Sequence, residues 1–400
     1  MSETVTNLRD TDLRDEVRAW LADNWDAQSE RPRAGGSLSD WHKLVFEAGW
    51  AVPSWPEHYW GRGLDKEDTS TVIAEFAKVR APGAGQDRLN ITANSIMQFG
   101  SEELKRRMIP EFLCGATMCL LYSEPGAGSD LASVRTRADQ KGDVYVVNGQ
   151  KVWTSGAQHA QYGLLLARTD WDVPKHSGLS FIILPMRQPG VEVRPINQIT
   201  GDSHFNEVFL DNAEAPVANR IGEEGEGWKV MQTALAVERL LMGEGGGEKR
   251  QGSFKDNSVS LIDFARDAGK LDDPVLRQQI AQAMAWRQLN ALNLVRARQE
   301  MAQGSSSPIM SLGKLAMSRI LHGDAAVMTK LHGAASMLDG ASDERAADVN
   351  YRTANAYMTS IGGGTDQIQR NIISERVLGL PREMEADRSI PFRESRAVTG

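Results

Sequence analysis

The stretch that decides the fold runs from residue 122 to residue 130 and reads Tyr-Ser-Glu-Pro-Gly-Ala-Gly-Ser-Asp. Gly126 and Gly128 flank a small residue and Ser129 follows, so the turn exposes consecutive backbone N–H groups and one hydroxyl group. Such a turn can bind an anion. It lacks the Gly-x-Gly-x-x-Gly spacing, and no strand–helix–strand pattern surrounds it, which disfavours a dinucleotide site of the Rossmann type. On its shape alone, the stretch is better explained as a tight loop after a strand.

A second stretch, Asn-Gly-Gln-Lys-Val-Trp-Thr-Ser-Gly at 148–156, follows a short β-rich run. Trp153 and Ser155 place an aromatic ring and a hydroxyl group near the end of a predicted strand. Together they could stack on a flat ligand and hydrogen-bond to it. In isolation, an ordinary buried tryptophan is the simpler interpretation.

A third stretch, Gly-Gly-Gly-Thr-Asp-Gln at 362–367, precedes a predicted helix. Three glycines permit unusually close approach of the backbone to a ligand. The free N–H groups at the helix start suit a phosphate or a carbonyl oxygen. A flexible hinge between two helices explains the stretch about equally well.

Outside these three stretches, the spacing of apolar residues along the chain is first typical of helices, then of β-strands, then again of helices. Short apolar runs separated by turn-forming pairs indicate an antiparallel sheet between the two helical regions. The runs are 144–147, 163–167, 179–184 and 207–210, and the pairs are Asn148-Gly149, Pro189-Gly190 and Asp211-Asn212. Helix starts are expected at Ser101, which caps a short helix running to Pro110, and at Asp273-Pro274 and Ser307-Pro308. The sequence therefore predicts an α+β chain with a helical domain at 1–118, an antiparallel β-domain at 119–226 and a helical domain at 227–400.

The composition is that of an ordinary globular protein and excludes several classes. Of the 400 residues, 41% are hydrophobic and 24% are charged, which rules out collagen and low-complexity disorder. The net charge of −8 disfavours nucleic-acid binding. No run approaches the roughly 20 apolar residues of a membrane span, and the polar start does not resemble a secretory signal. The two cysteines fit a reducing compartment, the histidines show no paired metal spacing, and we expect a cytoplasmic protein without a metal site.

Taken together, the three stretches and the helical–β–helical order resemble the acyl-CoA dehydrogenase family. The segments 205–211 and 225–228 resemble that family too, so the likeness covers nearly the whole chain. It implies that the C-terminal domain is a four-helix bundle and that FAD lies between this bundle and the β-domain. Ser123 matches a position that contacts the flavin ring, and Ser129 one that meets the pyrophosphate, with Gly128 allowing close approach. Trp153 matches the aromatic residue beside the isoalloxazine, and Ser155 a hydroxyl residue near the reactive N5.

The resemblance also implies a catalytic base, but not at the commoner of two positions. Many relatives carry a glutamate directly before a Gly-Thr pair, where this chain has Gly363. Isovaleryl- and long-chain-type members carry the glutamate directly before an arginine. This pattern matches Glu238 followed by Arg239, and the arginine is expected to support the base. Glu238 is then the expected base, and the backbone N–H of Gly363 can still bind the thioester carbonyl. Thr365 and Gln367 match contacts to the adenine side of FAD.

The assignment of Glu238 is not unique. A surface carboxylate paired with Arg239 is the alternative role, and three further carboxylates lie close in the sequence: Glu244, Glu248 and Asp366.

The resemblance implies dehydrogenation of an acyl-CoA to the trans-2-enoyl-CoA in fatty acid β-oxidation, with electrons passed to an electron-transfer flavoprotein. A homodimer or homotetramer is expected. Segments 243–254 and 332–336 depart from the family pattern for cofactor contacts between subunits, which leaves a mixed assembly open. Two other readings stay open: a non-catalytic partner subunit, and a flavin-dependent oxidase or oxygenase. The glycines at 362–364 hint at a branched or ring-bearing acyl group.

Overall fold

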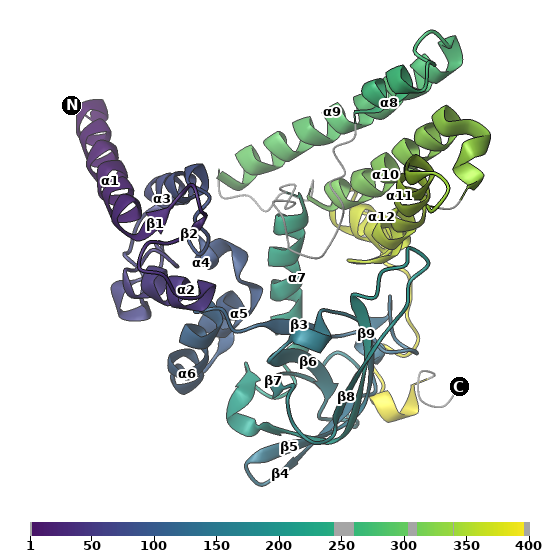
Figure 1. The fold of residues 1–400 in the computed structure, drawn as a ribbon. Helices are drawn as coiled ribbons and strands as arrows, with labels where there is room; N and C mark the ends of the chain where they lie inside the picture. The colour runs from purple at the N-terminus through teal and green to yellow at the C-terminus, as the bar shows by residue number, and fades with distance from the viewer. Residues whose placement is uncertain (1, 244–259, 303–309, 339, 396–400) are drawn as a thin grey trace.

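The computed structural model describes residues 2–243, 260–302, 310–338 and 340–395, and in parts of some helices, including 236–243, the backbone alone. Helices, a sheet and further helices follow one another along the chain, so the expected α+β architecture is confirmed (Figure 1). None of the described helices is long and apolar enough to cross a membrane.

The N-terminal region is built from helices around a tryptophan-rich core. Trp25, Trp41 and Trp50 are buried in it together with Phe76. The helix that begins after Ser101 does not end at Pro110, as expected, but continues to Leu113. Proline removes one helical hydrogen bond, but the buried side chains beyond it keep the last turn packed against the core. The elements are α1 (Ser2–Asn24), β1 (Trp25–Asp26), β2 (Arg31–Pro32), α2 (Leu38–Glu47), α3 (Lys66–Lys78), α4 (Gln86–Leu89), α5 (Ile91–Phe99) and α6 (Glu102–Leu113).

The middle region is an eight-stranded sheet with the order β10-β7-β6-β4-β5-β9-β8, and β3 pairs with β6. The pairing is mostly antiparallel, as expected, but β3 and β4 each pair with β6 in parallel. The strands are β3 (Met118–Leu121), β4 (Arg137–Lys141), β5 (Val144–Ser155), β6 (Tyr162–Arg168), β7 (Leu179–Pro185), β8 (Val191–Pro195), β9 (Phe205–Pro216) and β10 (Arg220–Ile221).

Two of the expected turns are bulges inside long strands. Asn148-Gly149 lies within β5 and Asp211-Asn212 within β9, where the pairing of the two strands shifts register. The side chain of Asn148 accepts a hydrogen bond from the backbone N–H of Asn212 at 2.9 Å and joins the two bulges. A Cβ atom at Gly149 would lie 2.5 Å from the Thr136 hydroxyl, so glycine here permits close approach of another backbone rather than chain reversal.

The C-terminal region is helical, and α10 packs against α7, α8, α9, α11 and α12. Asp273 caps α9 as expected, whereas Ser307-Pro308 lies outside the described residues. The helices are α7 (Gly227–Gly243), α8 (Leu261–Asp267), α9 (Pro274–Ala302), α10 (Met310–His332), α11 (Glu344–Ile361) and α12 (Asp366–Arg376). The last strand ends at Ile221 and α7 begins at Gly227, in the interval of the expected second domain boundary, which stays a prediction along with the first. After α12, residues 377–395 return to the sheet (Figure 1).

Candidate cofactor site

The first two stretches singled out in the sequence lie side by side. The loop 122–130 closes on itself through paired backbone hydrogen bonds between Glu124 and Ala127, at 3.0 and 3.1 Å. The backbone N–H of Val152 in β5 donates to the carbonyl of Ser123 at 2.9 Å. The glycine loop, as we call residues 122–130, is therefore attached to β5 just before Trp153.

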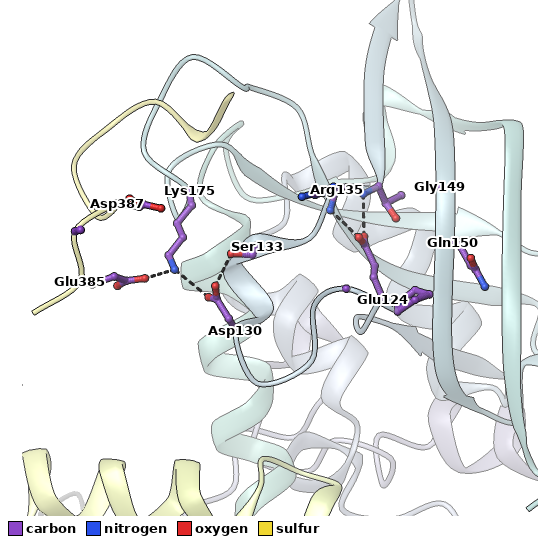
Figure 2. Close-up of a pocket in the computed structure, with 13 residues that line it drawn as sticks. Glu124, Asp130, Ser133, Arg135, Gly149, Gln150, Lys175, Glu385 and Asp387 are labelled. Atoms are coloured by element: carbon purple, nitrogen blue, oxygen red, sulfur yellow. Dashed lines mark hydrogen bonds and ion pairs between the residues drawn. The ribbon is translucent and has the colours of Figure 1, made fainter. Parts of the chain in front are cut away.

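A buried ion pair fixes this attachment. The ammonium group of Lys151, which has no exposed surface, donates to the Glu124 carboxylate at 2.8 Å and to the carbonyls of Tyr122 and Leu166. The same carboxylate accepts the backbone N–H groups of Arg135 and Thr136, at 2.7 and 2.8 Å (Figure 2). Each group of the pair is thus surrounded by hydrogen-bond partners, as a buried charge requires.

The surroundings determine which way the carboxyl group titrates. Burial alone would raise the pKa of Glu124, but Lys151 and the two amide donors outweigh burial and hold this pKa below its usual value. Burial lowers the pKa of Lys151, and Glu124 opposes that effect. We conclude that the carboxylate form of Glu124 belongs to the native structure at neutral pH.

Trp153 is held away from the core by an irregular backbone. It has a φ of 61°, rare for a residue with a bulky side chain, and it lies where the pairing of β5 with β9 shifts register. A bulge re-aims a side chain, and 59% of Trp153 is exposed, whereas the ring edge meets Phe205 at a centroid distance of 6.2 Å. The reading of Trp153 as an ordinary core residue is therefore wrong. Ser155 and the neighbouring residues of the glycine loop, Gly128 and Ser129, are exposed as well.

The glycine loop borders a cavity of about 720 Å³. Its walls include Gly126 and Asp130 of the loop, Gly149 and Gln150 of β5, and Lys175 (Figure 2). A Cβ atom at Gly126 or Gly128 would meet nothing within 4 Å, so packing within the chain does not require glycine at either position. The cavity wall also carries the carboxylates of Glu124, Glu385 and Asp387, and it does not include Gly128 or Ser129. The anion-binding role of the loop therefore rests on the exposure of Gly128 and Ser129 themselves.

The third stretch lies between α11 and α12, and its hydrogen bonds stay within the C-terminal helices. The Thr365 hydroxyl caps α12 by accepting the backbone N–H of Ile368 at 3.2 Å. Gly363 is exposed with a φ of 64°, and the buried side chain of Gln369 donates to its carbonyl at 3.2 Å. Gln367 is exposed on the first turn of α12. The turn is therefore held in one orientation by Gln369, which argues against a free hinge.

The expected base lies on α7, a helix that packs against β6, β7, α5 and α10. Glu238 and Arg239 belong to this helix, but their side chains lie outside the described part of the structure, as do Glu244 and Glu248. Asp366 is engaged elsewhere, because it pairs with Lys314 at 3.2 Å and accepts the Ser318 hydroxyl at 2.8 Å. Of the three competing carboxylates, the one that is described is thus committed to the packing of α10 against α12.

Sequence reasoning missed the roles of Glu124 and Lys151, although both lie in the quoted stretches. A signal was present in the sequence, since the first stretch carries two carboxylates, Glu124 and Asp130, and the second carries one lysine, Lys151. No group of three or more potential metal-ligating residues occurs within the described ranges.

Family models match the chain along most of its length. The acyl-CoA dehydrogenase N-terminal domain matches residues 9–116, the middle domain 119–213 and the C-terminal domain 225–378. The chain belongs to the acyl-CoA dehydrogenase family. It is an oxidoreductase of that family, and the family implies a flavin cofactor.

Relatives and solved structures agree with this assignment. The chain is 34% identical to acyl-CoA dehydrogenase IpdE1 of Mycolicibacterium smegmatis over 94% of its own length and 98% of that protein. IpdE1 of Mycobacterium tuberculosis is 35% identical, over 93% and 98%. Among solved structures, the Tcur3481-Tcur3483 steroid ACAD is 26% identical with a TM-score of 0.68, covering 94% of this chain and 98% of that one. The ChsE4-ChsE5 complex of Mycobacterium tuberculosis is 28% identical with a TM-score of 0.63 over the same shares.

The residues present fit a flavin. Trp153 offers an exposed aromatic surface beside the glycine loop, in which Gly128 and Ser129 are exposed as well.

Proposed function

We propose that this acyl-CoA dehydrogenase binds FAD and oxidises a ring-bearing acyl-CoA thioester to its trans-2-enoyl derivative. The single observation that carries the proposal is Trp153, an exposed tryptophan in a left-handed bulge directly beside a loop of exposed anion-binding groups. This backbone conformation costs about 1–3 kcal/mol, and it turns the tryptophan ring out of the sheet toward solvent.

In this proposal the described residues hold the cofactor at three places. Ser129 and the backbone at Gly128 bind the pyrophosphate, since both are exposed at the open side of the glycine loop. Trp153 packs beside the isoalloxazine, with Ser123 and Ser155 as hydrogen-bonding neighbours. Thr365 and Gln367 bind the adenine side from α12. When bound, FAD would supply the hydride acceptor for the substrate's β-hydrogen.

Residues of the chain itself remove the substrate's α-proton and bind the thioester carbonyl oxygen. Glu238 takes the α-proton, and Arg239 supports it. The α-proton of a thioester is weakly acidic, so the negative charge that develops on the carbonyl oxygen needs a fixed donor. The backbone N–H of Gly363 is proposed for that role, since the bond from Gln369 to the Gly363 carbonyl orients the turn.

Two features support a bulky substrate. Residues 362–364 carry no side chains at the proposed thioester end of the site, and a solved relative is described as a steroid ACAD. We therefore replace the expected role in ordinary fatty acid β-oxidation with oxidation of a polycyclic, steroid-derived acyl-CoA. The expected cytoplasmic location and electron-transfer flavoprotein partner stay predictions.

We also propose that α9 is covered by a second acyl-CoA dehydrogenase chain, identical or homologous. This helix exposes large apolar side chains along its length: Val275, Met284, Leu289, Leu292 and Val295. Large apolar side chains exposed along one helix are typical of a surface that contacts another protein. The ChsE4-ChsE5 relative is a complex of two chains, which supports a mixed assembly as an alternative to a homo-oligomer.

The test is spectroscopic. The purified protein is expected to be yellow and to bleach on anaerobic addition of a steroid-derived acyl-CoA, faster than with straight short-chain acyl-CoA. A colourless protein that takes up no added FAD would support the partner-subunit reading. Reduced protein that turns over with oxygen as well as with an electron-transfer flavoprotein would support the oxidase reading.

A further inference from the structure

The C-terminal segment after α12 packs against the middle region of the molecule. Residues 377–395, which we call the strap, cross from the C-terminal helices to the sheet and lie against the loop 169–178 between β6 and β7 (Figure 1). The backbone N–H of Phe392 donates to the carbonyl of Val173 at 2.9 Å, and that of Arg393 to the carbonyl of Trp171 at 3.1 Å. Arg393 also forms an ion pair with Asp172.

The strap is anchored by one buried ring. Phe392 is fully buried, and the guanidinium carbon of Arg168 lies 3.4 Å from the centroid of its ring. This arrangement is a desolvated cation–π contact, the stronger kind. Burial lowers the pKa of Arg168 to about 10, so its guanidinium is charged at neutral pH.

The same guanidinium group holds the chain that leaves the glycine loop. Arg168 donates to the carbonyls of Ala132 at 2.7 Å and Val134 at 3.2 Å, and to the carbonyl of Lys175 at 3.1 Å. Arg168 therefore contacts both the strap and the residues that follow the glycine loop.

A second link runs through a nearly buried lysine. The Lys175 side chain, only 7% exposed, lies between two carboxylates: Asp130 of the glycine loop, at 3.0 Å, and Glu385 of the strap (Figure 2). Asp130 directly follows Ser129, and it also accepts the Ser133 hydroxyl. The strap thus reaches the proposed phosphate-binding turn through one ammonium group.

We propose that the strap holds the glycine loop in its cofactor-binding conformation, with Lys175 as a positioning residue that couples Glu385 to Asp130. The inference rests on the proposed function, because it takes Ser129 as a ligand of the FAD pyrophosphate. An ordered loop binds more tightly, because less conformational entropy is lost when the cofactor arrives. The strap also supplies Glu385, Ala386 and Asp387 to the wall of the cavity beside the loop.

The test compares Glu385→Gln with Glu383→Gln, a carboxylate two positions away on the same strap. After removal of the flavin, the FAD dissociation constant is measured by fluorescence quenching, and tryptic cleavage after Arg382 and Arg388 is followed over time. Glu385→Gln is expected to raise the dissociation constant about three- to fivefold and to speed cleavage of the strap. Glu383→Gln should behave as wild type.

Variants of Lys175 test whether this residue positions the glycine loop or only stabilises the fold. Lys175→Met should weaken FAD binding more than Glu385→Gln does, because it releases both carboxylates, and Lys175→Arg should restore binding. The melting temperature of the flavin-free protein should stay close to that of wild type in all of these variants.

The outcomes distinguish this inference from the proposed function. If Ser129→Ala loses FAD while Glu385→Gln and Lys175→Met bind it as wild type, the strap inference is overturned and the cofactor assignment stands. Wild-type protein that binds no FAD would overturn both. Equal loss of affinity in Glu383→Gln and Glu385→Gln would also overturn the role of Lys175.

Discussion

Single residues carry the cofactor proposal, and Trp153 is the most informative of them. Trp153 is 59% exposed and its ring meets Phe205 edge-on, so the side chain is expected to add little to the stability of the flavin-free protein. Trp153→Ala is therefore expected to raise the FAD dissociation constant about tenfold, the loss expected for a stacking contact worth about 1–1.5 kcal/mol. Calorimetry of the flavin-free protein should show a melting temperature close to that of wild type.

Trp153→Phe is the matched variant, since it keeps an aromatic surface in the same bulge and should recover much of the affinity. Unchanged FAD binding in Trp153→Ala, or a large drop in the melting temperature, would mean that the tryptophan serves the fold rather than the flavin.

The Glu124–Lys151 pair makes a prediction about acid stability. The native pKa of Glu124 lies below its usual value of 4.5, so the carboxylate contributes stability above about pH 4.5, and that contribution is lost as the pH falls through the lower native pKa. Glu124→Gln leaves Lys151 buried without its partner and should cost about 3–5 kcal/mol at pH 7. Urea unfolding at pH 7 and at pH 4 should show that the difference in unfolding free energy between wild type and variant is smaller at pH 4.

The control for this measurement is Glu111→Gln, which changes an exposed carboxylate on α6. It should follow the wild-type curve at both pH values. If the difference in unfolding free energy between wild type and Glu124→Gln is larger at pH 4 than at pH 7, Glu124 and Lys151 do not form an ionised pair.

At the scale of elements, α12 depends on Thr365 as its N-cap. Thr365→Ala should destabilise the flavin-free protein by about 1 kcal/mol, since the backbone N–H of Ile368 loses its acceptor. Thr365→Ser keeps the cap and should restore stability, as thermal unfolding can show. A Thr365→Ala variant with wild-type stability but weak FAD binding would assign the hydroxyl to the cofactor alone.

Local patterns predicted the elements whose causes are local. Ser101 and Asp273 cap helices as predicted, because a side-chain oxygen next to a helix start finds nearby N–H groups. The apolar runs of β6 and β7 predicted strands because both faces are buried. The Asn148-Gly149 pair predicts a turn, because the close approach of Thr136, just before β4, that requires glycine there has no local signal in the sequence.

The strap and the ion pair escaped prediction for the same reason. Phe392 and Arg168 are far apart in the sequence, and an isolated phenylalanine in a polar tail shows no periodicity that could predict burial. The family resemblance identified Ser123, Ser129 and Trp153 by position. It did not indicate that Lys151 holds them together, because that role follows from contacts with three carbonyl or carboxylate groups made only in the folded chain.

At the scale of the whole molecule, the exposed apolar row of α9 predicts an assembly. Wild-type protein should measure as a dimer or larger particle by light scattering, either alone or with a homologous chain. Leu292→Lys, on the exposed side of α9, should weaken that assembly, because burying an unpaired charge in an apolar interface is costly. Lys substitution at Leu38, an exposed residue at the start of α2, is the matched control. A monomer under all conditions would contradict the proposed interface.

In our proposal, turnover depends on Glu238 of α7 as the catalytic base, in place of a carboxylate at Gly363. The most direct measurement is steady-state turnover and flavin content of Glu238→Gln, beside Glu226→Gln, an exposed carboxylate just before α7 that pairs with Lys229. We expect Glu238→Gln to retain FAD and to lose turnover by about 10²–10⁴-fold, the usual contribution of a general base, while Glu226→Gln keeps wild-type activity. A Glu238→Gln variant that stays yellow and turns over at the wild-type rate would show that Glu238 is not the catalytic base.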